Sequence, residues 1–320
     1  MNFNLLIENL TNPALLFFFL GILAVYLKSD LEIPAGTSKF ISLYLLFCIG
    51  FKGGQELAHG EFSTEIVYSM VFGVVLSAII STYTFFILKK KFNVFDAGAV
   101  AAAYGSVSAV TFVTASNYLE SMHLQVHGHM VAIMALMESP AIIVGLILIS
   151  KFNKSEDSHI NKTEVIKHSF TNGSVLLILG SLVIGLLAST KQAEGIKPFT
   201  TDIFKGFLAI FLLDMGIASG RKLSSFLNYG SFPIIFGIAI PILNGCIVAL
   251  ASNMVTHDVA NKFIFAILGA SASYIAVPAA MKIAAPQANP GLFLPMALAI
   301  TFPINITIGM PLYFMLASYV

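Results

Sequence analysis

Two stretches combine apolar character with a high density of small residues: DAGAVAAAYGSVSAVTFVTASNYLE at 96–120 and FAILGASASYIAVPAAMKIAAP at 265–286. Each is long enough to cross a bilayer, which takes about 20 apolar residues in a helix. Gly, Ala and Ser fill their middle positions, where a helix that faces lipid would carry Leu, Ile and Phe. The two stretches therefore predict membrane-spanning helices that are enclosed by other helices.

The composition of the whole chain agrees with a membrane protein. Of 320 residues, 57% are hydrophobic and 10% are charged, whereas a soluble domain carries about 25% charged residues. The formal net charge of +1 argues against electrostatic nucleic-acid binding. Cys48 and Cys246 lie in apolar stretches and provide no disulfide framework. We expect an all-α polytopic membrane protein, and exclude a soluble enzyme, a disordered chain and a secreted scaffold.

Ten segments are apolar enough to be candidate transmembrane helices. They lie at 13–28, 37–55, 65–89, 95–121, 127–150, 173–190, 200–219, 226–255, 258–284 and 291–318. Residues 1–12 are amphipathic and contain no Lys or Arg, which predicts an interfacial helix and not a cleavable signal peptide.

The basic residues orient these ten segments. Alternating the loops from an outside N-terminus places twelve of the 17 Lys and Arg residues on one side and five on the other. An excess of Lys and Arg marks the cytoplasmic side. This predicts that both termini face outward from the plasma (inner) membrane, and that the polar segment 151–172 is a cytoplasmic linker.

The linker separates two halves, 1–150 and 173–320, that carry similar fragments. The matching pairs are 45–57 with 211–223, 105–109 with 269–273, and 138–143 with 301–306. Five spans per half is an odd number, so two copies must lie in opposite orientations. Inverted repeats of this kind are typical of secondary transporters.

Spans four and nine are expected to be broken near their middle, at corresponding places in the two halves. Pro278 cannot donate a helical hydrogen bond. The N-termini of half-helices would face an anion, and their carbonyl ends and nearby hydroxyls could hold a small cation; close helix packing is the alternative use of such small residues. The candidate substrate-binding residues are Gly105, Ser106, Ser108, Thr111, Gly269, Ser271, Ser273 and Tyr274.

Two acidic residues lie inside spans, where a charge is costly and suggests function. Glu138 precedes Ser139 and Pro140, and suits a sodium ligand or a proton carrier. Asp214 has either a functional role or a structural pairing with Lys52 or Lys205. The candidate cation-binding residues are Glu138, Ser108, Thr111 and Asn305, with Glu138 as the sodium ligand.

Other chemistry finds less support in the sequence. His123, His127 and His129 cluster on one loop, but no second ligand set at a fitting spacing accompanies them. There is no GxxxxGK[ST] phosphate loop, GxSxG elbow or HExxH pair. We therefore expect no organic cofactor, and an ion gradient would have to supply the energy for uphill transport.

Several motifs resemble those of the sodium-dependent bicarbonate transporter family, and the resemblance covers nearly the whole chain. They are CIGFKGG at 48–54, YGSVSAVT with Gly105, Ser108 and Thr111, MESPA with Glu138, and PQANPGLF with Asn289 and Pro290. The resemblance implies sodium-coupled bicarbonate import in a bacterial membrane. It also implies a core domain that moves against a gate domain, a homotrimer, and possible control by a PII-like cytoplasmic protein.

The chain departs from the family pattern in span nine. Tyr274 stands where the family has an aspartate, and Ala276 and Val277 replace a serine and a glycine. In span four, Ala109 and Val110 stand in place of a Gly-Ser pair. These changes leave open a non-transporting membrane sensor or scaffold that keeps the fold. A membrane-embedded enzyme is disfavoured, because no nucleophile, base and orienting group can be assembled.

Overall fold

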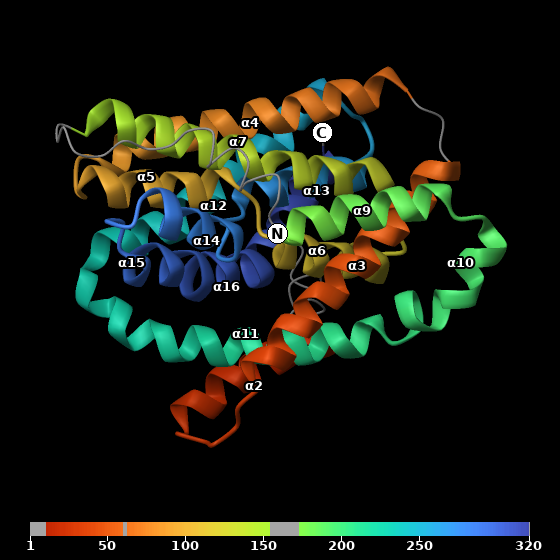
Figure 1. The fold of residues 1–320 in the computed structure, drawn as a ribbon, viewed down its shortest axis with the longest axis horizontal. Coiled ribbons are helices and arrows are strands. Elements are labelled where there is room, and N and C mark those ends of the chain that lie inside the picture. Colours follow the sequence, from red (N-terminus) through yellow and green to blue (C-terminus); the bar gives the residue numbers. More distant parts are fainter. Residues whose placement is uncertain (1–10, 60–62, 154–172, 320) are drawn as a thin grey trace.

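The computed structural model describes residues 11–59, 63–153 and 173–319, and within those ranges it is helical with no strand (Figure 1). The helices are α2 (Pro13–Tyr26), α3 (Ala35–His59), α4 (Thr64–Leu88), α5 (Val94–Gly105), α6 (Ala109–Ser121), α7 (Gly128–Phe152), α9 (Gly173–Leu187), α10 (Thr190–Lys197), α11 (Phe204–Phe226), α12 (Ser231–Ala251), α13 (Val259–Ala270), α14 (Ala276–Ala284), α15 (Pro290–Pro295), α16 (Phe302–Ile304) and α17 (Met310–Tyr319). The predicted interfacial helix at 1–12 and the predicted linker at 151–172 lie almost wholly outside the described residues.

Six helical stretches are long and apolar enough to cross a membrane. They are Thr64–Leu88, Val94–Ser121, Gly128–Phe152, Thr190–Leu223, Ser231–Met254 and Pro290–Tyr319. Three shorter apolar helices, α2, α9 and α13, accompany them. Large apolar side chains such as Val75 of α4 and Ile247 of α12 are exposed, as is expected of helices that face lipid. The chain is therefore a multi-pass membrane protein.

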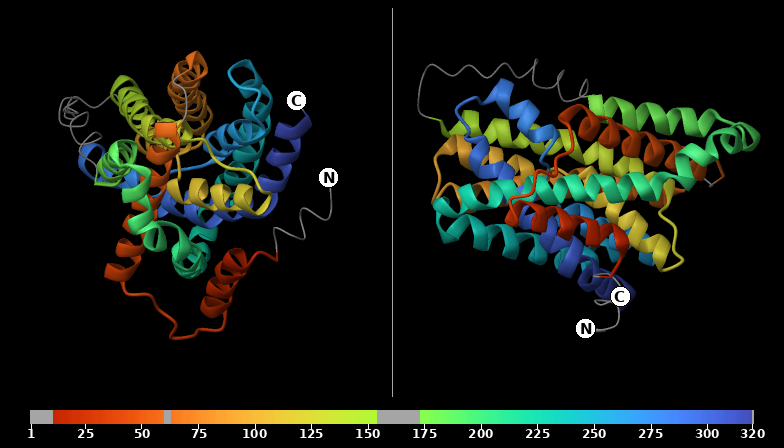
Figure 2. Two further views of the ribbon diagram at one scale, coloured as in Figure 1. Left: turned by 90° about the vertical axis from the view of Figure 1, so that its right-hand side faces the viewer. Right: turned by 90° about the horizontal axis from the view of Figure 1, so that it is seen from below.

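Two helix pairs pack closely because glycines meet at their contacts. Gly21 of α2 lies against Gly216 of α11, and Gly54 of α3 lies against Gly185 of α9. A Cβ atom on either Gly21 or Gly54 would collide with the backbone of the partner helix. Small residues permit this approach between membrane helices. Figure 1 shows α3 beside α9, and α2 where it crosses α11; a turned view in Figure 2 shows α2 at the edge of the molecule.

The remaining long helices enclose the two stretches that are rich in small residues. α5 packs against α4 and α7, while α13 packs against α12 and α17. Residues 97–105 of α5 and 260–270 of α13 are all buried. The prediction that these stretches are packed inside the protein is confirmed.

The last helical stretch begins at Pro290 and contains three further prolines, Pro295, Pro303 and Pro311, at intervals of eight residues. Pro lacks an N–H group and clashes with the carbonyl one turn back. The chain accommodates these prolines by widening into π-helical turns over Met296–Thr301 and Asn305–Gly309, since a π turn changes the hydrogen-bonding register.

Candidate functional site at two helix breaks

The first break separates α5 from α6. α5 ends at Gly105, and Ser106 and Ser108 adopt extended conformations before α6 begins at Ala109. The Ser108 hydroxyl caps α6 by accepting a hydrogen bond from the Thr111 N–H at 3.2 Å. The break therefore arises from a serine cap that starts a new helix in the middle of the span.

The second break separates α13 from α14. α13 ends at Ala270, Ser271 is extended, and α14 begins at Ala276. Pro278 lies in the first turn of α14, where its missing N–H group costs little. The Ser273 hydroxyl accepts a hydrogen bond from the Val277 N–H at 3.4 Å. Both spans that were predicted to be broken are broken.

The two breaks touch each other. The Ser273 N–H donates to the Ala103 carbonyl at 2.8 Å, and the Ser108 N–H donates to the Ser271 hydroxyl at 3.1 Å. Residues 163 or more positions apart in the sequence thus hold the crossing together, through one backbone–backbone bond and one bond to a serine hydroxyl. The first turns of α6 and α14, which carry N–H groups without partners inside their own helices, lie beside this crossing.

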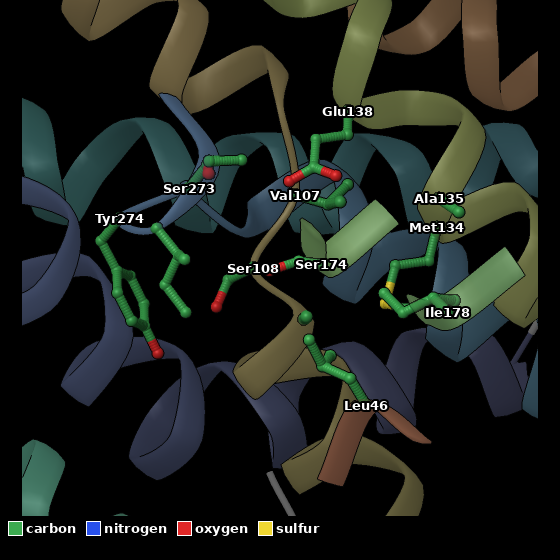
Figure 3. Close-up of a pocket in the computed structure, with 13 residues that line it drawn as sticks. Leu46, Val107, Ser108, Met134, Ala135, Glu138, Ser174, Ile178, Ser273 and Tyr274 are labelled. Atoms are coloured by element: carbon green, nitrogen blue, oxygen red, sulfur yellow. The ribbon is translucent and has the colours of Figure 1, made fainter. Parts of the chain in front are cut away.

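A small pocket opens at the crossing, and we call it the break pocket. Its polar lining consists of Ser108, Glu138, Ser174, Ser273 and Tyr274 (Figure 3). The other lining residues are Leu46, Val107, Ala109, Met134, Ala135, Ile178, Ile275 and Ala276. Helices α3, α6, α7, α9 and α14 all contribute, so the pocket lies between the broken helices and the α3–α9 pair.

Among the described residues that line the break pocket, Glu138 is the one with an acidic side chain. Figure 3 shows its carboxylate beside Val107, on the same side of the pocket as Ser273. It has no hydrogen bond or ion pair with any of the residues that the structure describes. A half-buried carboxylate inside a membrane span that has no partner calls for a proton or a cation.

Tyr274 contributes a second polar group without a partner. Its ring packs edge-on against Phe302, with 6.0 Å between the ring centroids. Its hydroxyl is buried and has no hydrogen-bond partner within the described part of the chain. The pocket thus offers a phenol O–H group where the family pattern has an aspartate.

Other candidate residues lie in the walls around the break pocket and not in its lining. Gly105 packs against Ser81 of α4, and Gly269 packs against Val248 of α12. Ser106 is buried, with a hydroxyl that finds no partner among the described residues. The Thr111 side chain is also buried.

Asn305 hydrogen-bonds to the last residue of α13, at the second break. Its amide N–H group donates to the Ala270 carbonyl at 2.7 Å, and its Oδ1 atom accepts from the Tyr313 hydroxyl at 3.1 Å. Nearby, the Tyr104 and Thr301 hydroxyls lie 2.7 Å apart. The Asn305–Ala270 bond fixes the end of α13, directly before Ser271.

The structural pairing predicted for Asp214 is wrong. Its carboxylate accepts a short hydrogen bond from the Ser38 hydroxyl. Lys52 and Lys205 instead approach Glu120, at 3.7 and 3.4 Å. The sequence separations are 68 and 85 residues, and nothing in the local sequence indicates either pairing.

The histidine cluster contacts one carboxylate, that of Asp258, and has no set of metal ligands among the described residues. His127 Nε2 lies 3.7 Å from Asp258 Oδ2, and the His127 and His129 rings stack at 5.8 Å. Within the described ranges, no group of three His, Cys, Asp or Glu side chains has metal-binding geometry. The Asp258 carboxylate raises the pKa of His127, and His127 lowers the pKa of Asp258.

These features define a polytopic helical membrane protein with a small pocket, lined in part by polar side chains, at two broken helices. The chain belongs to the Na⁺-dependent bicarbonate transporter superfamily, whose family model matches residues 13–318. No curated protein matches the chain. Membership in this family identifies the chain broadly as a bicarbonate transporter. The family name states bicarbonate and sodium as the transported species.

Proposed function

We propose that this protein imports bicarbonate across the plasma membrane and that it couples import to sodium entry. The observation that carries the coupling is the unpartnered Glu138 carboxylate, which shares the break pocket with two helix N-termini. The helix ends favour an anion. The carboxylate disfavours one, unless a cation neutralises it first.

Repulsion between the Glu138 carboxylate and bicarbonate explains why bicarbonate would need sodium in order to bind. Two unit charges 4 Å apart interact by about 4 kcal/mol at an effective dielectric constant near 20. A negatively charged Glu138 in the break pocket would therefore repel bicarbonate by an amount that matters for binding. A sodium ion on Glu138, completed by the Ser108 hydroxyl and nearby carbonyl groups, converts that repulsion into attraction. Each ion then binds well only in the presence of the other.

Tyr274 extends the proposal to the substrate anion. A phenol O–H group is a neutral donor, and its ring is already fixed by Phe302. The hydroxyl can donate to a bicarbonate oxygen without adding a second negative charge to the pocket. Ser273 and the first turn of α14 would supply further donors to the same anion.

The proposed movement is of the elevator type, within an inverted-repeat architecture of ten spans. Residues 1–150 would form the first repeat and residues 173–320 the second. The reciprocal packing of α2 on α11 and of α3 on α9 supports this reading, as do the corresponding breaks after α5 and α13. The break pocket lies between two of these helices, α3 and α9, and the broken helices, which suits a core that slides against a gate.

The remaining parts of the proposal come from the resemblance and from the basic residues. They are outside termini, a cytoplasmic segment 151–172, a homotrimer and a PII-like regulator. The segment at 154–172 lies outside the described residues. A membrane sensor or scaffold without transport activity is the alternative that the experiment below would favour if uptake failed.

Uptake of labelled bicarbonate into proteoliposomes tests the proposal. We expect uptake against a bicarbonate gradient when an inward sodium gradient is imposed. An equal potassium gradient serves as the control, and an inward proton gradient tests the alternative coupling ion. Uptake that follows the proton gradient alone would refute sodium coupling, and uptake under none of these gradients would refute transport.

A further inference from the structure

A second cavity lies along the same helices as the break pocket, and we call it the lysine cavity. Its volume is about 640 Å³, and its charged lining residues are Lys52, Glu56, Glu120, Glu194 and Lys197. It lies between α6 and the helices α3, α10 and α11. In the proposed topology this cavity faces the outside.

Helices α3 and α6 line both spaces, and along each of them the break pocket comes before the lysine cavity, so the two spaces lie one after the other. On α6, Ser108 lines the break pocket, and Phe112, Ser116 and Glu120 line the lysine cavity. These four residues recur every four positions and share one helix face, with about 18 Å between the first and the last. On α3, Leu46 lines the break pocket, and Lys52, six residues later, lines the lysine cavity.

Buried apolar side chains separate the two spaces. Phe112, Ile49 and Val131 line the lysine cavity on α6, α3 and α7, at the positions closest to the break pocket. Their exposed fractions are 1%, 7% and 3%. The lysine cavity is therefore an approach to the break pocket that is closed at its inner end.

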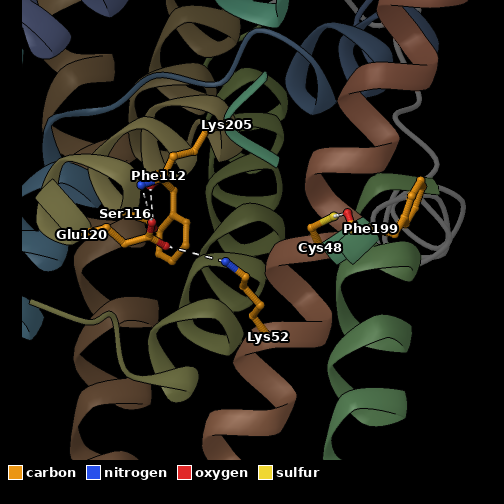
Figure 4. A network of polar contacts seen from close by, with 7 residues as sticks. All are labelled: Cys48, Lys52, Phe112, Ser116, Glu120, Phe199 and Lys205. Atoms are coloured by element: carbon orange, nitrogen blue, oxygen red, sulfur yellow. Dashed lines mark hydrogen bonds and ion pairs between the residues drawn. The ribbon is translucent and has the colours of Figure 1, made fainter. Parts of the chain in front are cut away.

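Glu120 occupies a particular position in this approach. One of its carboxylate oxygens lies 3.7 Å from the Lys52 ammonium, and the other lies 3.4 Å from the Lys205 ammonium (Figure 4). Lys52 also lies over the Phe204 ring, 5.2 Å from its centroid. Each oxygen of one planar anion thus meets one ammonium group.

We propose that Lys52 and Lys205 form an entry site for bicarbonate and that the Glu120 carboxylate occupies this site when bicarbonate is absent. Bicarbonate and carboxylate are both planar oxyanions of one negative charge built on a trigonal carbon. An arriving bicarbonate would displace Glu120 and would take its place between the two ammonium groups. The inference rests on the proposed function, since it assigns an approach site to the same substrate.

The partial exposure of all three side chains suits such an exchange. The exposed fractions are 33% for Lys52, 39% for Glu120 and 65% for Lys205. Ion pairs at this exposure are weak and exchange readily with solvent ions. The Glu120 carboxylate can therefore leave its place without a large energetic cost.

The experiment compares KM for bicarbonate among single variants in proteoliposomes at low ionic strength. Glu120→Gln removes the internal competitor and is expected to lower KM by about two- to fivefold, the factor that corresponds to one exposed ion pair. Lys52→Gln and Lys205→Gln remove the ammonium groups and are expected to raise KM by a similar factor. High salt should abolish both shifts through screening.

Matched controls come from the same cavity. Glu194 and Lys197 line it and form none of the ion pairs found in the described part of the chain. Glu194→Gln and Lys197→Gln should leave KM near the wild-type value. Lys52→Arg, which keeps the charge, should retain most of the affinity, and size-exclusion profiles of all purified variants check that they fold.

The direction of the shifts decides the outcome. If the three residues only clamp α6 to α3 and α11, Glu120→Gln and Lys52→Gln break the same clamp and shift KM in the same direction. That result, with wild-type transport intact, would overturn the entry site alone. Absence of bicarbonate uptake by the wild-type protein would instead overturn the proposed function.

Discussion

Tyr274 is the residue in which this chain departs most clearly from its family's pattern. Its side chain lines the break pocket, and its buried hydroxyl makes no hydrogen bond among the described residues. We predict that Tyr274→Phe raises KM for bicarbonate by about two- to tenfold, since one hydrogen bond is worth roughly 0.5–1.5 kcal/mol. The sodium concentration that gives half-maximal uptake should stay nearly unchanged.

Tyr313→Phe is the matched control for that substitution. The Tyr313 hydroxyl donates to the Pro241 carbonyl and to Asn305, both at 3.1 Å. Its loss should lower the melting temperature of the purified protein, whereas Tyr274→Phe should not. A Tyr274→Phe variant with lower stability and unchanged KM would assign the hydroxyl a packing role.

At the scale of residues, the sequence predicts features that depend on neighbouring residues in the chain, such as helix breaks. Ser108 and Ser271 were expected at helix breaks because serines, glycines and a nearby proline interrupt a helix in recognisable ways. Ser174 and Leu46 line the same pocket and were not predicted. They come from helices whose position depends on tertiary packing alone.

At the scale of elements, the close contact of α3 with α9 depends on glycine. A Cβ on Gly185 would collide with the Phe51 carbonyl oxygen and would stand 3.1 Å from the Gly54 Cα. We predict that Gly185→Ala destabilises the protein by about 1–3 kcal/mol, the usual range for overpacking. A thermal melt followed by size exclusion measures the effect.

Gly180 of the same helix provides the control. A Cβ at this position would meet no atom within 4 Å, so Gly180→Ala should be neutral or should stabilise by up to about 1 kcal/mol through helix propensity. Equal effects of the two substitutions would contradict the close contact between α3 and α9.

The His127–Asp258 contact joins the start of α7 to the start of α13 and makes stability depend on pH. Other charged or titratable groups that act on His127 are Glu56, Glu65 and His129. The raised pKa of His127 gives stability that is complete below the unfolded value of about 6.5 and is lost as pH rises through the folded value. The lowered pKa of Asp258 gives stability that is lost as pH falls below about 4.

We therefore predict that this pair stabilises most between about pH 4 and pH 6.5. The melting temperature should fall less between mildly acidic and alkaline pH in His127→Gln than in the wild type. The contribution of the pair to the free energy of unfolding should be at most about 1 kcal/mol, because both groups are partly exposed. His123→Asn, at an exposed histidine of the same loop, should leave the pH profile as in the wild type. Identical profiles for the wild type and His127→Gln would refute the contribution.

The sequence predicted which helices are buried better than it predicted which helices pack against each other. The small residues of α5 and α13 predicted burial, and the structure encloses both helices. The hydropathy pattern carries no information on which helix lies beside which. The meeting of α6 with Lys52 and Lys205 therefore became visible only in three dimensions.

At the scale of the whole molecule, α2, α3, α9 and α11 pack in pairs, and the break pocket lies where α3 and α9 meet the broken helices. Movement between these two groups would carry the pocket from one side to the other. The charge of Glu138 would set the condition for that movement, since an anion and a bare carboxylate do not share a small pocket favourably.

The most direct test is bicarbonate affinity of the purified protein, measured by calorimetry at low and high sodium. In the wild type and in the control Glu194→Gln, sodium should tighten bicarbonate binding at least about fivefold, the lower end of common coupling between two sites. Glu138→Gln should bind bicarbonate equally at both sodium levels. A sodium dependence in Glu138→Gln equal to that of the wild type would contradict the role of Glu138 in coupling.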